Sequence, residues 1–177
     1  MSDLNLLTKS DYLLFRESPV HLWAHLHGRF DESVSEFEQF LGRQGYQVER
    51  LAHDYLLNIW LPAHPGSSLA WQQTFTDGDF IARVDGLITT ADGRLHLVEI
   101  KSSTNVDKDK IIDVAWQASV LRGQVEIETC LLLHQNKDYL RVGQLNFEHL
   151  FVMEDVTEKV IEQVPGILAE REAMLAA

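Results

Sequence analysis

The sequence predicts an α/β domain in which helices pack against a central sheet. Two observations predict it. Apolar residues in the N-terminal part recur every three to four positions, which is the spacing of amphipathic helices. Residues 79–90 and 94–102 instead follow the two-residue period of strands and are rich in Ile, Val and Leu. Helices followed by a hairpin, a helix and further strands are typical of a layered α/β fold.

The N-terminal elements are expected to be helical. Residues 10–27 carry an apolar stripe, and Pro19 should kink or break that helix because proline lacks the N–H group that a helix needs. Asp31-Glu32-Ser33 is typical of the start of a second helix. Residues 62–68, with their proline, glycine and serine residues, predict a connecting loop. A short helix is expected over residues 69–73.

The C-terminal half alternates between helix and strand. Helical spacing over residues 107–122 predicts a helix that ends before a glycine. Residues 125–134 predict a buried strand, and residues 139–143 predict another. Residues 156–174 are helical in pattern, with a break expected at Pro165-Gly166.

We expect all 177 residues to form one domain in three parts. Residues 1–75 would form an N-terminal helical part, residues 76–145 a hairpin–helix–strand core, and residues 146–177 an acidic, helical C-terminal part. The chain is 45% hydrophobic and 24% charged, which is typical of a globular protein with a real core. It has no apolar run of membrane-spanning length, and its start lacks a secretory signal, so we expect a cytoplasmic protein with no membrane association.

Charge and cysteine content restrict the function classes. The formal net charge of −12 argues against charge-driven, sequence-indifferent binding of nucleic acid. Residues 145–177 hold seven acids and two bases. This segment is interpreted as a solvated helix, with a surface for a protein partner as the alternative. Cys130 is the single cysteine, so an internal disulfide and a cysteine cluster for zinc or iron–sulfur are excluded.

The residues with chemical content lie in the predicted hairpin. Along the second strand Leu95, Leu97, Glu99 and Lys101 share one face, which therefore changes from apolar to charged. Ionised groups on a buried face are costly unless they are paired or bind a metal. A salt bridge at a strand end is one interpretation, and a metal site is the other.

Asp85, on the preceding strand, bears on this choice through the turn between the strands. If Asp92-Gly93 formed a two-residue loop, Asp85 would lie opposite Ile100. Asp85 and Glu99 would then point to opposite faces of the sheet, and they could not share a metal.

A three-residue loop gives the opposite result, and we expect this register. With Ala91-Asp92-Gly93 as the loop and the glycine left-handed in a bulge, Thr90 pairs with Arg94. Asp85 then lies directly opposite Glu99, with Cβ atoms about 4.5–5.5 Å apart. Two facing carboxylates repel each other and favour a divalent cation, and hard oxygen ligands suit Mg²⁺ or Mn²⁺.

The pattern Asp85-x13-Glu99-x-Lys101 resembles the PD-(D/E)XK nuclease superfamily, specifically its RecB-like branch. The resemblance covers most of the chain and extends to an uncharacterised bacterial family of that branch. It implies a restriction-endonuclease-like fold, with a mixed central sheet of about four strands flanked by helices. The segments that carry it are residues 7–12, 81–86, 98–103, 113–117 and 134–139.

The resemblance also implies an activity, the metal-dependent hydrolysis of DNA phosphodiester bonds to leave 5′-phosphate ends. Asp85 and Glu99 would hold Mg²⁺ or Mn²⁺ together with the backbone carbonyl of Ile100. Such an ion neutralises the scissile phosphate and generates a hydroxide-like nucleophile. Lys101 would orient or deprotonate the attacking water, or stabilise developing charge. The residues fit an exonuclease and an endonuclease equally, and they do not separate DNA from RNA.

Further residues have roles implied by the resemblance or by their position. Gln117 on the following helix would contact the substrate or orient the lysine, with a surface glutamine as the alternative. RecB-like proteins usually add a tyrosine one turn later, where this chain has Leu121. Glu49 is the candidate third metal ligand, with a solvent-facing charge as the alternative. Arg83 and Lys110 are candidate phosphate contacts.

Two departures shape the remaining expectations. Some RecB-like relatives hold an iron–sulfur cluster through a Cys-Pro pair and three later cysteines, but this chain has Ser18-Pro19 there, so no cluster is expected. The acidic charge and the missing tyrosine favour an alternative function. The chain would then be a weak or inactive nuclease-fold module that binds nucleic acid or a protein, and it could be one part of a larger assembly.

Overall fold

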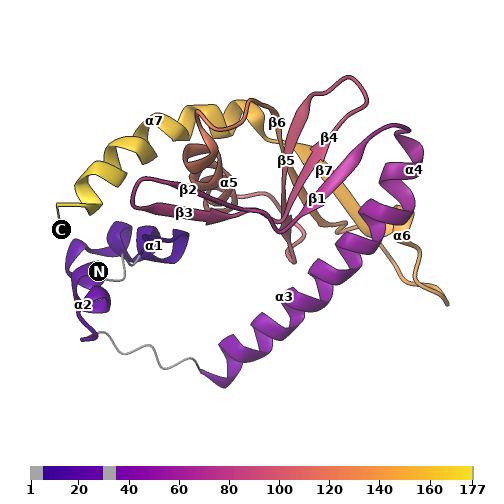
Figure 1. The fold of residues 1–177 in the computed structure, drawn as a ribbon. Helices are drawn as coiled ribbons and strands as arrows, with labels where there is room; N and C mark the ends of the chain where they lie inside the picture. The colour runs from indigo at the N-terminus through magenta and orange to yellow at the C-terminus, as the bar shows by residue number, and fades with distance from the viewer. Residues whose placement is uncertain (1–5, 30–34, 177) are drawn as a thin grey trace.

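The computed structural model describes residues 6–29 and 35–176, in which helices cover both faces of a five-stranded sheet (Figure 1). Neighbouring strands are antiparallel except β5 and β6, which are parallel. The predicted α/β fold with a mixed central sheet is confirmed, with five strands rather than about four. The sheet has the order β1 (Ser68–Trp71), β4 (Gly86–Thr89), β5 (Leu95–Lys101), β6 (Ile127–Gln135) and β7 (Phe151–Asp155).

The other elements surround this sheet. A separate two-stranded ribbon extends from it (Figure 1), formed by β2 (Thr74–Asp77) and β3 (Phe80–Arg83). The helices are α1 (Lys9–Glu17), α2 (Pro19–Leu26), α3 (Glu36–Tyr55), α4 (Leu61–Ala63), α5 (Lys108–Leu121), α6 (Phe147–Leu150) and α7 (Thr157–Met174), with a π-helical turn, η1 (Leu56–Trp60), between α3 and α4.

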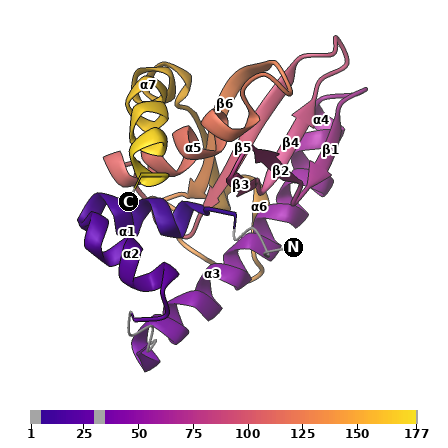
Figure 2. The same ribbon diagram turned by 60° about the vertical axis from the view of Figure 1, so that its left-hand side comes forward.

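The central strands are buried on both sides. One core lies between the sheet and the helices α5 and α7, and Leu97 of β5 belongs to it. The second core lies between the sheet and α3, and includes the alternate residues Val98 and Ile100. Figure 2 shows α5 and α7 together on the first side and α3 on the other.

Helix ends follow local sequence signals where the chain supplies them. The predicted helix over 10–27 is divided at Ser18-Pro19 into α1 and α2, as expected from the proline. Asp107 is the N-cap of α5, and its side chain accepts a hydrogen bond from the backbone N–H of Lys110 at 3.2 Å. The second helix start predicted at Asp31-Glu32-Ser33 lies outside the described residues. Helix α3 is described from Glu36 onwards.

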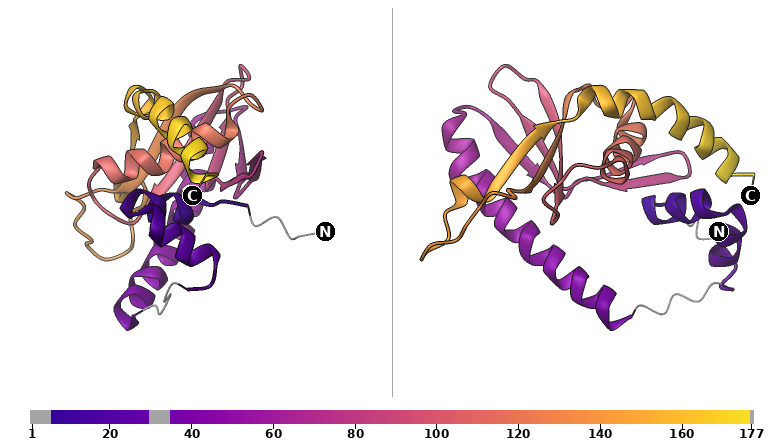
Figure 3. Two further views of the ribbon diagram at one scale, coloured as in Figure 1. Left: turned by 90° about the vertical axis from the view of Figure 1, so that its left-hand side faces the viewer. Right: turned by 180° about the vertical axis from the view of Figure 1, so that it is seen from behind.

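Two sheet edges differ from the prediction. The short helix expected over 69–73 was wrong, because residues 69–71 belong to strand β1, which pairs with β4. The strand expected over 139–143 was also wrong. Leu140 and Val142 there are 85% and 89% exposed, in a loop that projects beyond α6 (Figure 3, right). The free edge of β6 is taken by β7, which the sequence pattern did not reveal.

Helix α7 continues through Pro165, so the predicted break was wrong. Val160 and Ile167 are buried on either side of the proline, and their packing holds both halves in one helix. Arg171 anchors the C-terminal half, since its Nη1 donates to the carbonyl of Ser119 at 2.9 Å. Across residues 6–29 and 35–176, no helix combines the length and the apolar character that crossing a membrane requires. Binding of a protein partner through this helix stays a prediction.

Candidate active site

The turn of the β4–β5 hairpin has the predicted three-residue form. The backbone N–H of Thr90 donates to the carbonyl of Arg94 at 2.9 Å, and the N–H of Gly93 donates to the carbonyl of Thr90 at 2.9 Å. Gly93 is left-handed, with φ +85°, a conformation that glycine adopts without strain. The predicted register is therefore confirmed.

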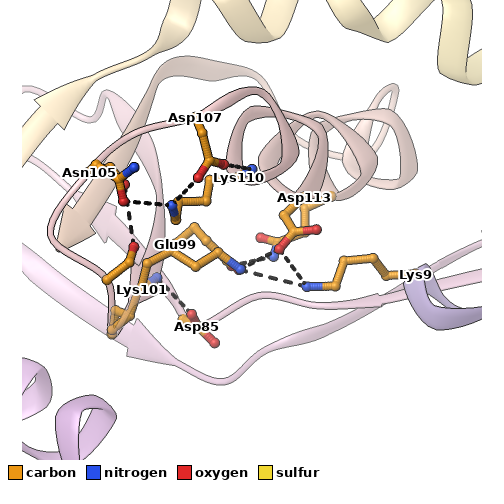
Figure 4. Close-up of polar contacts among 11 residues, drawn as sticks. Lys9, Asp85, Glu99, Lys101, Asn105, Asp107, Lys110 and Asp113 are labelled. Atoms are coloured by element: carbon orange, nitrogen blue, oxygen red, sulfur yellow. Dashed lines mark hydrogen bonds and ion pairs between the residues drawn. The ribbon is translucent and has the colours of Figure 1, made fainter. Parts of the chain in front are cut away.

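This register brings the two predicted carboxylates level with each other. Gly86 pairs with Val98, so Asp85 and Glu99 are the next two residues facing each other. Asp85 precedes β4 rather than lying inside a strand, because the strand expected over 79–90 is divided into β3 and β4. Its Oδ2 accepts a hydrogen bond of 2.8 Å from the backbone N–H of Ile100 (Figure 4).

Burial and the neighbouring carboxylate of Glu99 together raise the pKa of Asp85 from 3.8 to about 7. Both causes act against the ionised form, because a buried charge loses hydration and a like charge repels it. The hydrogen bond from Ile100 works in the opposite direction and is outweighed. Near neutral pH the carboxyl of Asp85 is therefore protonated more readily than an exposed aspartate.

Glu99 is 4% exposed, and both of its carboxylate oxygens are engaged. Oε1 forms an ion pair of 2.8 Å with Nζ of Lys101, and Oε2 accepts a hydrogen bond from Nε2 of Gln117. Gln117 is itself 4% exposed, which excludes the interpretation of a surface glutamine. Its Oε1 is buried and has no hydrogen-bond partner among the described residues. Such an atom commonly marks a place where a ligand or water completes a site.

Two residues that the sequence argument did not assign to the site also reach it. Asp113 Oδ2 accepts a hydrogen bond from Nζ of Lys101 and forms an ion pair of 3.1 Å with Nζ of Lys9 (Figure 4). Burial lowers the pKa of Lys101, but the carboxylates of Glu99 and Asp113 outweigh this and hold it above its ordinary value. In this arrangement of side chains Lys101 is thus a cation and a hydrogen-bond donor.

A signal for both missed residues was present in the sequence. Asp113 lies four positions before Gln117, so the two share one face of α5. Lys9 lies in the segment 7–12, which contributed to the family resemblance. Neither signal specified which side chains would pair, because the pairing depends on how α1 and α5 pack together.

A cleft of about 410 Å³ opens onto this group of side chains. Arg83 lines it, and its side chain is exposed beside Asp85. Lys110 does not line it, since its Nζ pairs with Asp107 and donates to Oδ1 of Asn105 at 3.2 Å. The cleft is lined by Thr8, Lys9, Ser10, Thr74, Ile81, Ala82, Arg83, Asp85, Glu99, Trp116 and Gln117.

Glu49 approaches the site from α3. Its Oε1 accepts a hydrogen bond from Nε2 of Gln72, whose backbone N–H donates to the carbonyl of Asp85 at 2.9 Å. The charge of Glu49 adds to the causes that raise the pKa of Asp85. Within residues 6–29 and 35–176, no three His, Cys, Asp or Glu side chains converge as a ready metal-binding group. A third ligand at Glu49 therefore stays a prediction.

The fold places this chain in the class of α/β proteins whose architecture is similar to that of known nucleases. The chain is similar to the crystal structure of an alkaline exonuclease, LHK-Exo, from Laribacter hongkongensis, with a TM-score of 0.53 and 16% sequence identity over 96% of this chain and 89% of that one. The structure of LHK-Exo in complex with dAMP gives a TM-score of 0.56 at 15% identity over the same shares. At these identities the likeness shows the fold. No protein-family model and no curated protein matches the sequence.

Proposed function

We propose that this protein is a metal-dependent nuclease of the PD-(D/E)XK type that hydrolyses DNA phosphodiester bonds. The observation that carries the proposal is the facing pair of Asp85 and Glu99, with Lys101 two residues further along the same strand face. The likeness of the fold to an alkaline exonuclease supports it independently of these residues.

The residues present fit a magnesium or manganese ion. The N–H and C=O groups of one strand residue point to the same side of the strand. Because the N–H of Ile100 donates to Asp85, the carbonyl of Ile100 also faces the side on which β4 has ended. Asp85, Glu99 and that carbonyl supply hard oxygen ligands, and Mg²⁺ keeps several waters in such sites. A divalent cation would also relieve the repulsion that raises the pKa of Asp85.

Each of the surrounding side chains has a task in the proposed reaction. When bound, the metal ion supplies charge neutralisation at the scissile phosphate and lowers the pKa of an attacking water. Lys101, as an ammonium group, donates hydrogen bonds that orient the water or stabilise charge on the phosphate. Gln117 holds Glu99 through Nε2, and its buried Oε1, which has no partner among the described residues, would accept a hydrogen bond from a water. Arg83 contacts a phosphate at the rim of the cleft.

DNA is the proposed substrate, and the cleft is the proposed place of binding. LHK-Exo, which is similar to this chain in fold, is an alkaline exonuclease, and its structure is known in complex with dAMP. In this chain the net charge of −12 weakens nonspecific attraction of DNA to the whole surface. Binding of DNA therefore depends on the few positively charged side chains that surround the cleft.

Two observations favour the alternative of an inactive binding module. Lys101 is engaged by two carboxylates, and both oxygens of Glu99 are occupied by Lys101 and Gln117. In addition Leu121, at the position of the usual tyrosine, is fully buried in the core. A chain that kept these contacts in the presence of metal would bind its partner without cutting it.

Isothermal titration calorimetry with Mn²⁺, together with a DNA cleavage assay, distinguishes the nuclease from the inactive binding module. The nuclease proposal expects one saturable site in the wild type and its loss in Asp85→Asn and Glu99→Gln. It also expects cleavage of DNA by the wild type, and Lys101→Met should keep metal binding while losing cleavage. Asp92→Asn is the matched control, because that carboxylate is exposed at the tip of the same hairpin. Metal binding without cleavage of single- or double-stranded DNA favours the binding module, and absence of the metal site rejects the nuclease.

A further inference from the structure

We infer that Lys9 is a phosphate-binding residue of this site and that Asp113 is the positioning residue that holds it there. The inference rests on the proposed function and adds a second lysine, from a different helix, to the residues that contact the DNA strand. The juxtaposition that carries it joins α1, β5 and α5 in one group of charges: Lys9, Glu99, Lys101 and Asp113.

The residues just before Lys9 hold it in place through backbone hydrogen bonds to a distant part of the chain. The backbone N–H of Leu7 donates to the carbonyl of Asp79 at 2.7 Å, and the N–H of Ile81 donates to the carbonyl of Leu7 at 3.0 Å. These bonds tie the segment before Lys9 to β3. Thr8 then forms a capping box with Asp11, which starts α1 at Lys9. The first turn of α1 is thereby fixed as a wall of the cleft.

The side chain of Lys9 reaches the reactive group from this wall. Its Nζ lies 3.1 Å from Oδ2 of Asp113 and 4.0 Å from Oε1 of Glu99. Figure 4 shows Lys9 and Lys101 approaching Asp113 from different elements. The side chain of Lys9 is 34% exposed and that of Lys101 is 19% exposed. Lys9 is therefore the lysine that a strand in the cleft would meet first.

The balance of charge in this group explains why Lys9 would bind an anion. Two lysines and two carboxylates cancel as long as Glu99 interacts with the lysines. Asp113 carries a single negative charge, and both ammonium groups share the same oxygen, Oδ2. If Glu99 serves as a metal ligand, as proposed, its charge is directed to the cation and one lysine is left without a full counter-charge. A phosphate group supplies that charge, and ammonium groups bind phosphate as point charges.

A purely structural salt bridge between α1 and α5 is the competing explanation of the contact. The helix α1 is already fixed to α5 by the stacking of Tyr12 on Trp116, whose ring centroids lie 4.9 Å apart. The backbone bonds of Leu7 add to this attachment. Ion pairs that are partly exposed contribute little to stability. The two explanations differ in what they predict for DNA binding.

The first experiment measures binding of a short fluorescein-labelled oligodeoxynucleotide by anisotropy, in Ca²⁺ and over a series of salt concentrations. The variants are Lys9→Met, Lys9→Arg and the control Lys159→Met, which removes an exposed lysine on α7 away from the cleft. We expect Lys9→Met to weaken binding on the order of tenfold. Its slope of log affinity against log salt should fall by about 1. Lys9→Arg should restore most of the affinity, and Lys159→Met should match the wild type.

The second experiment separates binding from chemistry in steady-state cleavage with Mn²⁺. Lys9→Met should raise KM with kcat nearly unchanged, whereas Asp113→Asn should raise KM and lower kcat, because Asp113 also holds Lys101. Binding of Mn²⁺ alone should be equal in wild type and Lys9→Met. If the wild type cuts DNA but Lys9→Met keeps the affinity, salt slope and KM of Lys159→Met, the inference is overturned and the nuclease proposal stands. If the wild type neither binds nor cuts DNA, both are overturned.

Discussion

The side chain of Asp85 caps the end of a strand pairing: its Oδ2 accepts a 2.8 Å hydrogen bond from the backbone N–H of Ile100. If β4 continued, a backbone carbonyl would accept this bond. The carboxylate therefore lies at the point where the sheet opens, level with Glu99 and half-buried in the wall of the cleft. That position makes it costly to ionise and well placed to hold a cation.

The first prediction follows from this cost. The pKa of Asp85 is raised from 3.8 to about 7 in the folded protein. In the pH window between these two values the folded protein binds a proton that the unfolded chain releases. Stability is therefore lost as the pH rises through the window. Asp85→Asn removes the effect and should raise the free energy of unfolding by about 1–3 kcal/mol above neutral pH. Urea denaturation in the presence of a chelator measures it.

The pH dependence and the metal response make this prediction specific. The gain of Asp85→Asn should shrink towards acid pH, where the wild-type carboxyl is protonated. Addition of Mn²⁺ should stabilise the wild type and not the variant. Asp92→Asn should show no gain, because hydrogen bonds from Thr90 and Arg94 lower the pKa of that exposed carboxyl. A variant that is less stable than the wild type at every pH would contradict the proposed repulsion.

The second prediction concerns the single cysteine. Burial raises the pKa of the Cys130 thiol to about 12, and the charge of Asp155 adds to the shift. Because the thiolate is the reactive form, iodoacetamide should modify native Cys130 far more slowly than the unfolded chain. Mass spectrometry of samples quenched at intervals, with and without urea, measures both rates. Equal rates would show that the β6 core opens easily.

The third prediction concerns the buried guanidinium of Arg171. Its Nη1 donates to the carbonyl of Ser119, its Nη2 forms an ion pair of 2.7 Å with Asp77, and its charge lies 4.1 Å above the ring of Phe80. Arg171→Met should lower the free energy of unfolding by about 2–3 kcal/mol, because it leaves a buried carbonyl without a donor. Arg122→Met, at an exposed position, should change stability little. Urea denaturation distinguishes them, and equal effects would rule out an anchoring role.

Part of this molecule follows from its sequence by local rules. The turn at Ala91-Asp92-Gly93 allows two registers, and the requirement for a left-handed glycine, together with the placing of acids, was enough to choose the right one. The break at Ser18-Pro19 likewise follows from the chemistry of one residue. In such cases the determining interactions lie within a few residues of each other.

Other features depend on contacts between distant segments. Lys9 pairs with Asp113, which is more than half of the chain away in sequence. No local sequence signal near either residue specifies this partner. Pro165 stays within a helix because Val160 and Ile167 are buried against other elements. Val142 lies in a loop although its neighbours alternate as a strand would, because β7 occupies the only edge that β6 has left among the described strands.

The fourth prediction concerns Gln117, whose Nε2 donates to Glu99 while its Oε1 lacks a partner among the described residues. Gln117→Leu removes the donor to a buried carboxylate but also removes an unsatisfied acceptor, so the two effects on stability oppose each other. The free energy of unfolding should therefore change by only about 1 kcal/mol. Under the proposed function kcat for DNA cleavage should nevertheless fall on the order of 10–100-fold, because the carboxylate of Glu99 loses its orientation. Gln163→Leu on α7 is the control. A loss of kcat that merely tracks a large loss of stability would assign Gln117 to the core rather than to the site.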